Sequence, residues 1–504
     1  VEGRPTALAS PAVLTAQDDG WRLAPVGIRF GGGEAKIGGL FGGSAVDFDV
    51  SLTRLPLGIA DLVAPDLGLA GEATGRVTYA ARDGAAPAGR MNLTIRGLSR
   101  SGTLRSSTPI DLGIVGLIDA RGAAARAILA SGGQTLGRGQ ARLAPLGPGD
   151  DMIARLLAAP LAAQLRYKGP AGSLWRLAGV DAVDLSGPVE LATDIGGRLT
   201  DPVIRGSLRA TGARLQAPAT GTVVQNVDAT GRFDGSRLIV DRFTGAPVGG
   251  GAVSGHATFD FAAARGFAMD IAIDAQEARL LNRDDIAATV TGPLTLRYDG
   301  VVGVISGDLK LNRSAFRLGR AAAAEVPQLK VTEVNRDEIG PIYRPTVPWR
   351  LDLKTVARNR LAVTGLGLDS EWRADLTIAG DVDAPRITGS AELVRGGYQF
   401  AGRRFDLDRG TIRFNGESPP DPSLDITAQA NLSGLNATIR VGGTGQHPEI
   451  SFTSVPALPE DELLARLLFG TSITNLSAPE ALQLASAVAS LQRDSICRRQ
   501  REGN

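Results

Sequence analysis

Apolar and polar residues alternate with a period of two in many segments of the chain, which is the pattern of β-strands with one buried face. Across residues 424–432, the apolar side chains fall on one face and the polar side chains on the other. Strands with one buried apolar face and one exposed polar face are typical of antiparallel sheets, whereas the strands of an α/β core are apolar on both faces. The sequence therefore predicts an all-β fold: a long curved sheet of irregular antiparallel or mixed strand repeats that forms a groove.

Four segments with clear alternation supply the side chains that we predict to line the apolar face of this groove. These side chains are Phe267, Met269, Ile271, Ile273, Trp372, Leu376, Ile378, Leu424, Ile426, Ala428, Leu432, Ile439 and Val441.

Glycine-containing turns such as Asp299-Gly300 and Asn415-Gly416 separate the predicted strands, because they supply the positive φ angles that hairpins require. Similar six-residue segments open strands at 201–206, 384–389 and 447–452, each with proline in second position. About one strand every 12 residues gives on the order of 40 strands. Because the spacing is irregular, the pattern indicates a quasi-one-dimensional array of strands rather than a solenoid of fixed period.

Helical patterns occur in three places and help to divide the chain. They predict a short helix near 150–159, a second near 459–469 and a third near 478–492, the last preceded by a capping box. We expect three segments: a β-repeat segment 1–180, groove repeats 181–380 and a C-terminal domain 381–504. The apolar residues of the second helix are predicted to face a partner, and they are Leu463, Leu464, Leu467, Leu468 and Phe469.

Composition favours a sheet whose apolar face is open. Hydrophobic residues make up 43% of the chain but aromatic residues only 5%, whereas packed sandwich cores usually draw on large aromatic side chains for volume. An open apolar trough implies an apolar cargo. An ordinary packed core remains the alternative interpretation.

Charge and reactive residues argue against other functions. The net charge of +1 offers no field for nucleic acid, and the single cysteine, Cys497, excludes an internal disulfide. Neither His256 nor His447 lies in a nucleophile or ligand motif. We therefore predict no catalytic residues, no cofactor and no metal site, and we expect that the protein is not an enzyme.

The C-terminal part of the chain resembles the TamB family, the inner-membrane component of the bacterial translocation and assembly module. The similar segments are 396–400, 405–414, 422–426, 458–470 and 482–485. The resemblance implies a protein that spans the periplasm of a Gram-negative bacterium as a hydrophobic β-groove. It also implies an Omp85-type outer-membrane barrel, TamA or BamA, as partner.

The same resemblance implies a role in outer-membrane biogenesis, with two cargoes left open. One is protein, through assembly and secretion of outer-membrane proteins including autotransporters, where the cargo is a hydrophobic β-strand. The other is phospholipid, transported between the two membranes.

The chain departs from the family pattern at both ends. No run of 18 apolar residues occurs, and the chain begins at Val1, so we expect the inner-membrane anchor to lie upstream. After Leu491 the chain continues into a basic tail where the family usually has further strands, which suggests a truncated or frameshifted end.

Two other functions predict different features of the sequence. A secreted structural or adhesive β-solenoid would show a regular repeat and a polar interior. A carbohydrate-processing β-helix enzyme would need acids clustered with aromatic residues on one face, and the sequence shows no such cluster.

Overall fold

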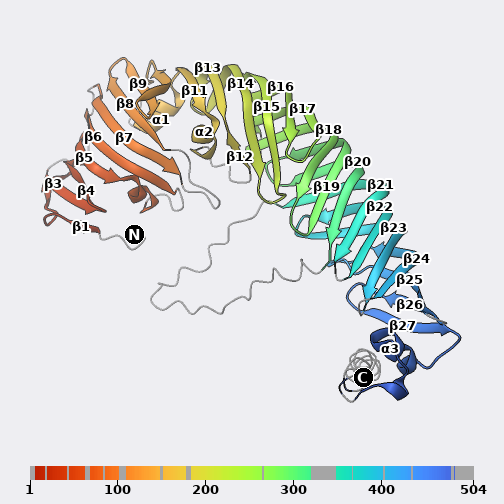
Figure 1. Ribbon diagram of the computed structural model, residues 1–504. Coiled ribbons are helices and arrows are strands. Elements are labelled where there is room, and N and C mark those ends of the chain that lie inside the picture. Colours follow the sequence, from red (N-terminus) through yellow and green to blue (C-terminus); the bar gives the residue numbers. More distant parts are fainter. Residues whose placement is uncertain are drawn as a thin grey trace. The chain divides into compact units, whose positions relative to one another are not determined.

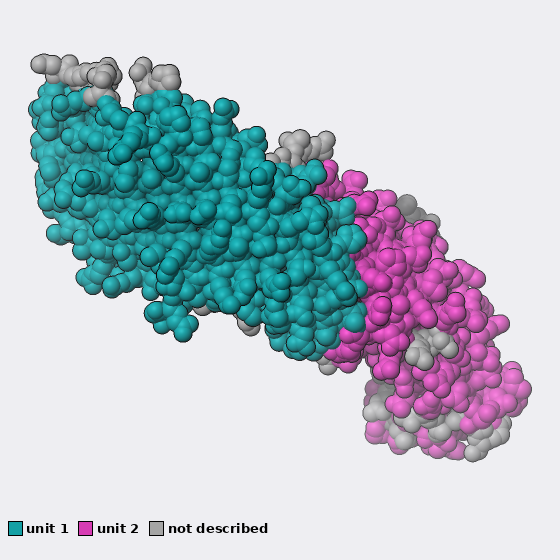
Figure 2. Space-filling view, turned by 90° about the horizontal axis from the view of Figure 1, so that it is seen from above, with its two compact units in different colours: residues 1–248, 252–271 teal, residues 249–251, 272–504 magenta. Residues whose placement is uncertain are grey.

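A computed structural model describes residues 6–17, 20–42, 45–62, 68–82, 86–100, 109–147, 151–177, 183–263, 266–318, 348–365, 367–400, 403–432 and 435–477, together with Pro479 and Leu482. These residues contain 27 β-strands and only short helices, and the all-β prediction is confirmed. The chain divides into two compact units (Figure 2): residues 1–248 and 252–271 form unit 1, and residues 249–251 and 272–504 form unit 2.

Unit 1 is built from strands that follow one another in sequence order (Figure 1). Its strands are β1 Thr6–Leu8, β2 Leu14–Gln17, β3 Gly20–Phe30, β4 Gly33–Phe41, β5 Ala45–Pro56, β6 Leu69–Arg82, β7 Ala88–Arg100, β8 Ile110–Asp119, β9 Gly122–Ser131, β10 Gln134–Leu143, β11 Leu161–Pro170, β12 Asp184–Ser186, β13 Pro188–Arg198, β14 Asp201–Ala217, β15 Thr222–Gly235, β16 Arg237–Pro247 and β17 Ala252–Ala263. Strand β18, Gly266–Asn282, contributes residues to both units.

From β3 to β11 each strand pairs antiparallel with the next, and β11 then pairs with β13. The ladder continues from β13 through β17 in the same antiparallel manner. The short strand β12 pairs with β14 instead. Because many of the strands repeat the period-two alternation, the ladder brings their apolar positions together on one face.

Three short helical segments belong to unit 1: the 3-10 helix η1 Leu57–Leu62, α1 Met152–Ala158 and α2 Ala171–Leu177. Asp151 caps α1, because its Oδ1 accepts from the N–H of Ile153 at 2.9 Å and of Ala154 at 3.3 Å. Helix α2 contacts β7 as well as β11 and β12. It therefore spans the apolar face between β7 and β11, which β8, β9 and β10 separate in the sheet.

Several strands of unit 1 bend at a β-bulge that the neighbouring strand caps. Gly97 and Gly212 have positive φ angles of 64° and 61° and lie where the register shifts. The N–H of Gly97 donates to Asp111 Oδ1 at 2.9 Å, and that of Gly212 to Asp228 Oδ1 at 2.8 Å. Since a bulge bends its strand and increases its twist, these capped bulges give the sheet curvature that alternation alone does not encode.

Unit 2 is also a ladder, with one change of direction. Its strands after β18 are β19 Ile286–Tyr298, β20 Gly303–Arg317, β21 Trp349–Gly365, β22 Leu368–Asp381, β23 Ala384–Phe400, β24 Arg403–Asn415, β25 Ser423–Leu432, β26 Leu435–Gly443 and β27 Pro448–Val455. Strands β20 and β21 run parallel. The other pairs, β19 with β20 and each step from β21 to β27, are antiparallel.

Helix α3, Glu460–Phe469, and the 3-10 turn η3, Ile473–Asn475, follow β27. The three acidic residues at the start of α3 suit the positive end of its dipole. Gly470, at φ 75°, ends the helix in the left-handed conformation. The helix expected near 478–492 lies outside the described residues apart from Pro479 and Leu482.

Candidate functional site

The apolar face of unit 1 consists of rows of side chains that continue from strand to strand. In one row Val77 lies opposite Met91, Met91 opposite Gly116, and Gly116 opposite Ala125, which lies opposite Ala141. Because neighbouring strands lie only about 4.8 Å apart, each row is a continuous apolar strip across β6–β10.

A hollow of about 300 Å³ lies on these rows, over strands β5–β10. Its lining is almost wholly apolar: Phe48, Val77, Thr78, Tyr79, Gly89, Arg90, Met91, Gly116, Leu117, Ile118, Ala123, Ala124, Ala125, Ala141 and Leu143. The volume falls at the lower end of the range for ligand pockets. We call this the apolar hollow.

Small residues open the apolar hollow at its centre, where Gly116, Ala125 and Ala141 are neighbours across the ladder. A Cβ added at Gly116 would come within 3.1 Å of the Met91 methyl carbon, and one at Gly89 within 2.8 Å of Ile118 Cγ2. The hollow thus depends on residues without side-chain bulk, and the larger side chains around them form its walls.

Three phenylalanines form a second apolar feature of unit 1, at the far end of its strand series. Phe259 and Phe261 on β17 lie with ring centroids 6.3 Å and 5.9 Å from that of Phe267 on β18. Phe261 is 50% exposed and Phe267 41% exposed. An exposed aromatic cluster of this kind is unusual in a soluble protein and marks a surface for apolar contacts.

The remaining predicted side chains of β18 are half-buried: Met269, Ile271 and Ile273.

In unit 2, the register places most of the predicted groove residues on one apolar face. Ala374 lies opposite Ala391, Ala391 opposite Ile412, and Ile412 opposite Leu424. The predicted residues on this face, apart from Trp372, are Leu376, Ile378, Leu424, Ile426, Ala428, Ile439 and Val441. Leu432 lies opposite Leu435 at the end of β25.

Trp372 belongs to the packed interior of unit 2. It is 1% exposed and clusters with Ala357, Ala374 and Ala391. Its indole Nε1 donates to Ser370 Oγ at 2.8 Å. With its polar atom satisfied and its ring enclosed, Trp372 leaves little surface for a ligand.

Helix α3 packs on the apolar face of β24–β27. Leu463, Leu464 and Leu467 are at most 1% exposed. They belong to one cluster with strand residues, which are Phe405, Ala428, Ala430, Leu435, Ala437, Ile439 and Phe452. Leu468 and Phe469 pack against the same cluster and are half-buried. The five side chains predicted to face a partner thus contact the chain's own sheet, and contact with a second protein stays a prediction.

Glu462 ties α3 to the turn that follows it. Its Oε2 accepts from Ile473 N at 2.8 Å and from Ser472 Oγ at 3.0 Å, while Oε1 accepts from Arg466 Nε at 2.7 Å. The hydrogen bond from the Ile473 N–H, with those from Arg466 and Ser472, lowers the pKa of Glu462 below its usual range. The charged form of Glu462 therefore stabilises the α3–η3 segment.

The opposite face of both units is polar and carries cross-strand ion pairs. In unit 1, Arg76 pairs with Asp49 and lowers the pKa of that carboxyl, chiefly through the side-chain hydrogen bond. In unit 2, Arg395 Nε lies 2.8 Å from Glu371 Oε2. These pairs are exposed, so each contributes little to stability. Their charges keep this face polar and hydrated.

The apolar hollow was not predicted from the sequence. The small residues at its centre are Gly116 on β8, Ala123 and Ala125 on β9 and Ala141 on β10, and such residues give no periodic signal of their own. The signal that would have found it is a run of small residues at the same parity in adjacent strands. Such a run can be recognised only when the register between neighbouring strands is known.

Within the described ranges, no group of three or more His, Cys, Asp or Glu side chains could hold a metal ion. The helices of the described residues are all too short or too polar to cross a membrane.

Comparison with known proteins shows the family. The model of the TamB C-terminal domain matches residues 241–500, more than half of the chain. The translocation and assembly module subunit TamB of Haemophilus influenzae is 25% identical over 190 residues, which cover 36% of this chain and 15% of that protein. The chain thus aligns with only a small part of this relative's length. It belongs to the TamB family.

Proposed function

We propose that this chain is part of a periplasm-spanning component of the translocation and assembly module, and that its apolar face binds the hydrocarbon chains of phospholipids. The apolar hollow of unit 1 carries this proposal, because it is a concave apolar surface in a protein whose other face is charged. The TamB family membership supports the cellular setting: the periplasm of a Gram-negative bacterium and attachment to the inner membrane.

The chemistry of the face favours acyl chains over β-strands as the cargo that lies in the hollow. Backbone N–H and C=O groups of β6–β10 are already paired in the ladder. An incoming strand laid on this face would find no partners for its own backbone groups, and each buried unpaired group is costly. A hydrocarbon chain makes no such demand and gains from burial. A strand cargo would need a sheet edge instead.

We further propose an Omp85-type outer-membrane barrel, TamA or BamA, as the partner that receives or inserts cargo. The name of the Haemophilus influenzae relative, a translocation and assembly module subunit, supports this partnership. In this setting the chain contributes to outer-membrane biogenesis without catalysis: it provides a surface along which apolar groups avoid water.

Filling the apolar hollow tests the proposal. The variant Ala125→Leu/Ala141→Leu adds two side chains on adjacent strands at the centre of the hollow. We expect the purified variant to carry several-fold less co-purifying phospholipid than the wild type, measured by native mass spectrometry and lipid extraction.

The matched control is Ala80→Leu/Ala88→Leu. These alanines are also direct cross-strand neighbours, but they lie on the polar face, so the control should keep the wild-type lipid content. If the wild-type protein carries no lipid, or if both variants retain it equally, the hollow is not the binding surface.

A further inference from the structure

The polar face of strands β7–β11 differs in charge from the rest of the molecule. The five strands contain eight basic residues and two acidic ones, a net charge of +6, whereas the whole chain has a net charge of +1. The two acids are at strand ends: Asp111 accepts from the bulge N–H of Gly97, and Asp119 binds Arg121. Neither carboxylate pairs with the basic residues in the middle of the face.

Three arginines on this face stand without a side-chain partner among the residues that the structure describes. Among the described residues, none forms an ion pair or hydrogen bond with the side chains of Arg126, Arg138 and Arg142. Arg138 even lies directly opposite Arg166 across β10 and β11, a like-charge arrangement that is unfavourable by itself. Elsewhere in unit 1, exposed arginines such as Arg232 and Arg237 pair with aspartates on the neighbouring strand.

Aliphatic side chains lie among these arginines, on the face that is otherwise polar. Val115, Leu117 and Ile128 are each 51% exposed. Val115 lies opposite Arg126, and Leu117 lies opposite Ala124, the direct neighbour of Arg142. We call Arg126, Arg138, Arg142, Val115, Leu117 and Ile128 together the basic patch.

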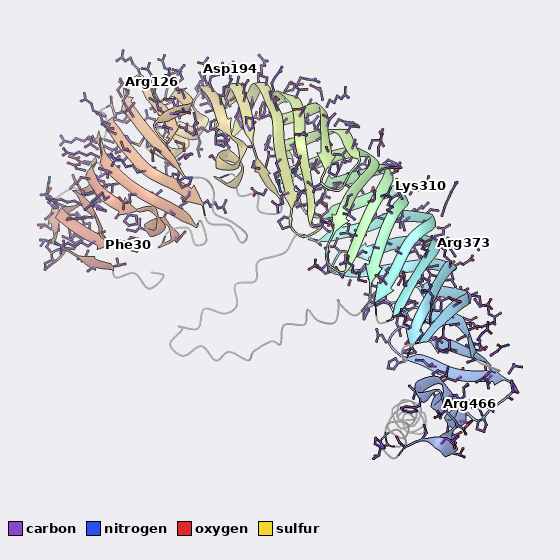
Figure 3. All side chains as sticks on the ribbon, viewed as in Figure 1. Phe30, Arg126, Asp194, Lys310, Arg373 and Arg466 are labelled. Atoms are coloured by element: carbon purple, nitrogen blue, oxygen red, sulfur yellow. The ribbon has the colours of Figure 1, made fainter. Side chains whose placement is uncertain are left out.

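A hollow of about 760 Å³ adjoins the patch. Arg126, Arg142 and Arg205 contribute to its lining. Gln140 and Gln164, joined by a hydrogen bond of 2.8 Å, lie between these arginines. Figure 3 labels Arg126 and Asp194, which lie in the same cross-strand row. Asp194 is neutralised by Arg166 at 2.9 Å, so the hollow offers guanidinium and amide donors to an anion.

From this arrangement we infer that the basic patch docks on an anionic lipid surface, with the arginines on phosphate groups and the aliphatic side chains at the boundary with the acyl chains. Guanidinium groups bind phosphate in a bidentate manner, and exposed aliphatic side chains between them gain by leaving water. The patch contains no aromatic side chain for base stacking, which distinguishes it from a nucleic-acid surface. The inference concerns the polar face and does not depend on cargo in the apolar hollow.

The test is flotation of the whole chain with two kinds of vesicle: phosphatidylglycerol and phosphatidylcholine in equal parts, and phosphatidylcholine alone. We expect binding to the anionic vesicles only, weakened by added salt. Each arginine near an anionic surface contributes about fivefold in partitioning. The variant Arg126→Gln/Arg138→Gln/Arg142→Gln should therefore partition on the order of a hundredfold less.

The matched control removes three positive charges at ion-paired positions, as Arg76→Gln/Arg232→Gln/Arg237→Gln, and should lose less than about fivefold. The variant Val115→Ser/Ile128→Ser, which keeps Leu117 because that residue also borders the apolar hollow, should weaken binding and keep its dependence on salt. Circular dichroism checks that all variants are folded.

Three outcomes would overturn the inference: no binding of the wild type to either vesicle, equal binding to both, or an equal loss in the two arginine variants. The hollow-filling variant Ala125→Leu/Ala141→Leu should still float with anionic vesicles. Loss of lipid from the hollow and loss of docking are thus measured separately.

Discussion

The open face over β5–β10 and the covered face over β24–β27 are made by the same alternation of residues, yet they offer different surfaces. In the first, glycine and alanine leave an apolar hollow. In the second, three leucines of α3 fill the space above Ala428, Ala437 and Ile439 and leave a packed cluster. An apolar strand face in this chain therefore does not by itself determine whether a ligand can bind. Side-chain size and the presence of a covering helix decide whether it can accept a ligand.

The largest expected effect tests whether Trp372 belongs to a ligand surface or to the packed interior. Trp372→Ala should lower the free energy of unfolding of unit 2 by about 3–5 kcal/mol, because it removes a buried aromatic side chain. Urea denaturation, with hydrogen exchange of the β21–β23 amides as the local readout, measures this change in the free energy of unfolding. Phe267→Ala, at an exposed ring, should change stability little. A destabilisation of similar size in both variants would contradict the distinction.

Shortening a leucine of α3 should make the covered face resemble the open one. Leu467→Ala removes a fully buried side chain and should cost about 2–5 kcal/mol, with stronger binding of an apolar dye as the helix loosens. Val455→Ala, on an edge residue that is 71% exposed, provides the control. Unchanged dye binding in a destabilised Leu467 variant would show that α3 does not cover a binding surface.

The capped bulges test whether the hollow depends on strand bending. Asp111→Ala leaves the Gly97 N–H without its acceptor and should cost about 1 kcal/mol. Because β7 and β8 also line the apolar hollow, lipid content should fall modestly. Asp228→Ala removes the equivalent cap at Gly212, outside the hollow. It should cost a similar amount of stability with no change in lipid.

The smallest effect concerns pH at the covered end. The pKa of Glu462 is lowered in the folded chain, so its stabilising contribution is present above its usual pKa and is lost as pH falls through the lowered value. The thermal midpoint of unit 2 should drop more steeply on acidification in the wild type than in Glu462→Gln. Parallel pH profiles for the two proteins would show that the Glu462 contacts do not stabilise α3.

The strands and the helices α1 and α3 were predictable because their signals are local, whereas α2 and η1 were not predicted. Period-two alternation identified the strand segments around Leu376 and Ile439, and the acidic first turn and Gly470 marked α3. The strands are longer than expected, up to 17 residues in β14, β18, β21 and β23. Bulges let a strand continue through a bend where alternation alone suggests that it ends.

The sequence did not predict which strands pair in parallel or which parts of the apolar face are covered, because both depend on residues far apart in the sequence. The parallel pairing of β20 with β21 has no signal in either strand. Trp372 alternates like its neighbours, and only the packing of three adjacent strands shows that it is enclosed. The hollow likewise arises where Gly116, Ala125 and Ala141 meet in register.

The hairpin-by-hairpin ladder of β3–β10 has a consequence for how this family can vary in length. Each strand contacts mainly its two neighbours and brings its own share of the apolar rows. A duplication or deletion of two adjacent strands would preserve both the up-and-down order and the side of the sheet that each residue faces. The number of strands in such a ladder, and with it the ladder's length, could therefore change without redesigning a central core.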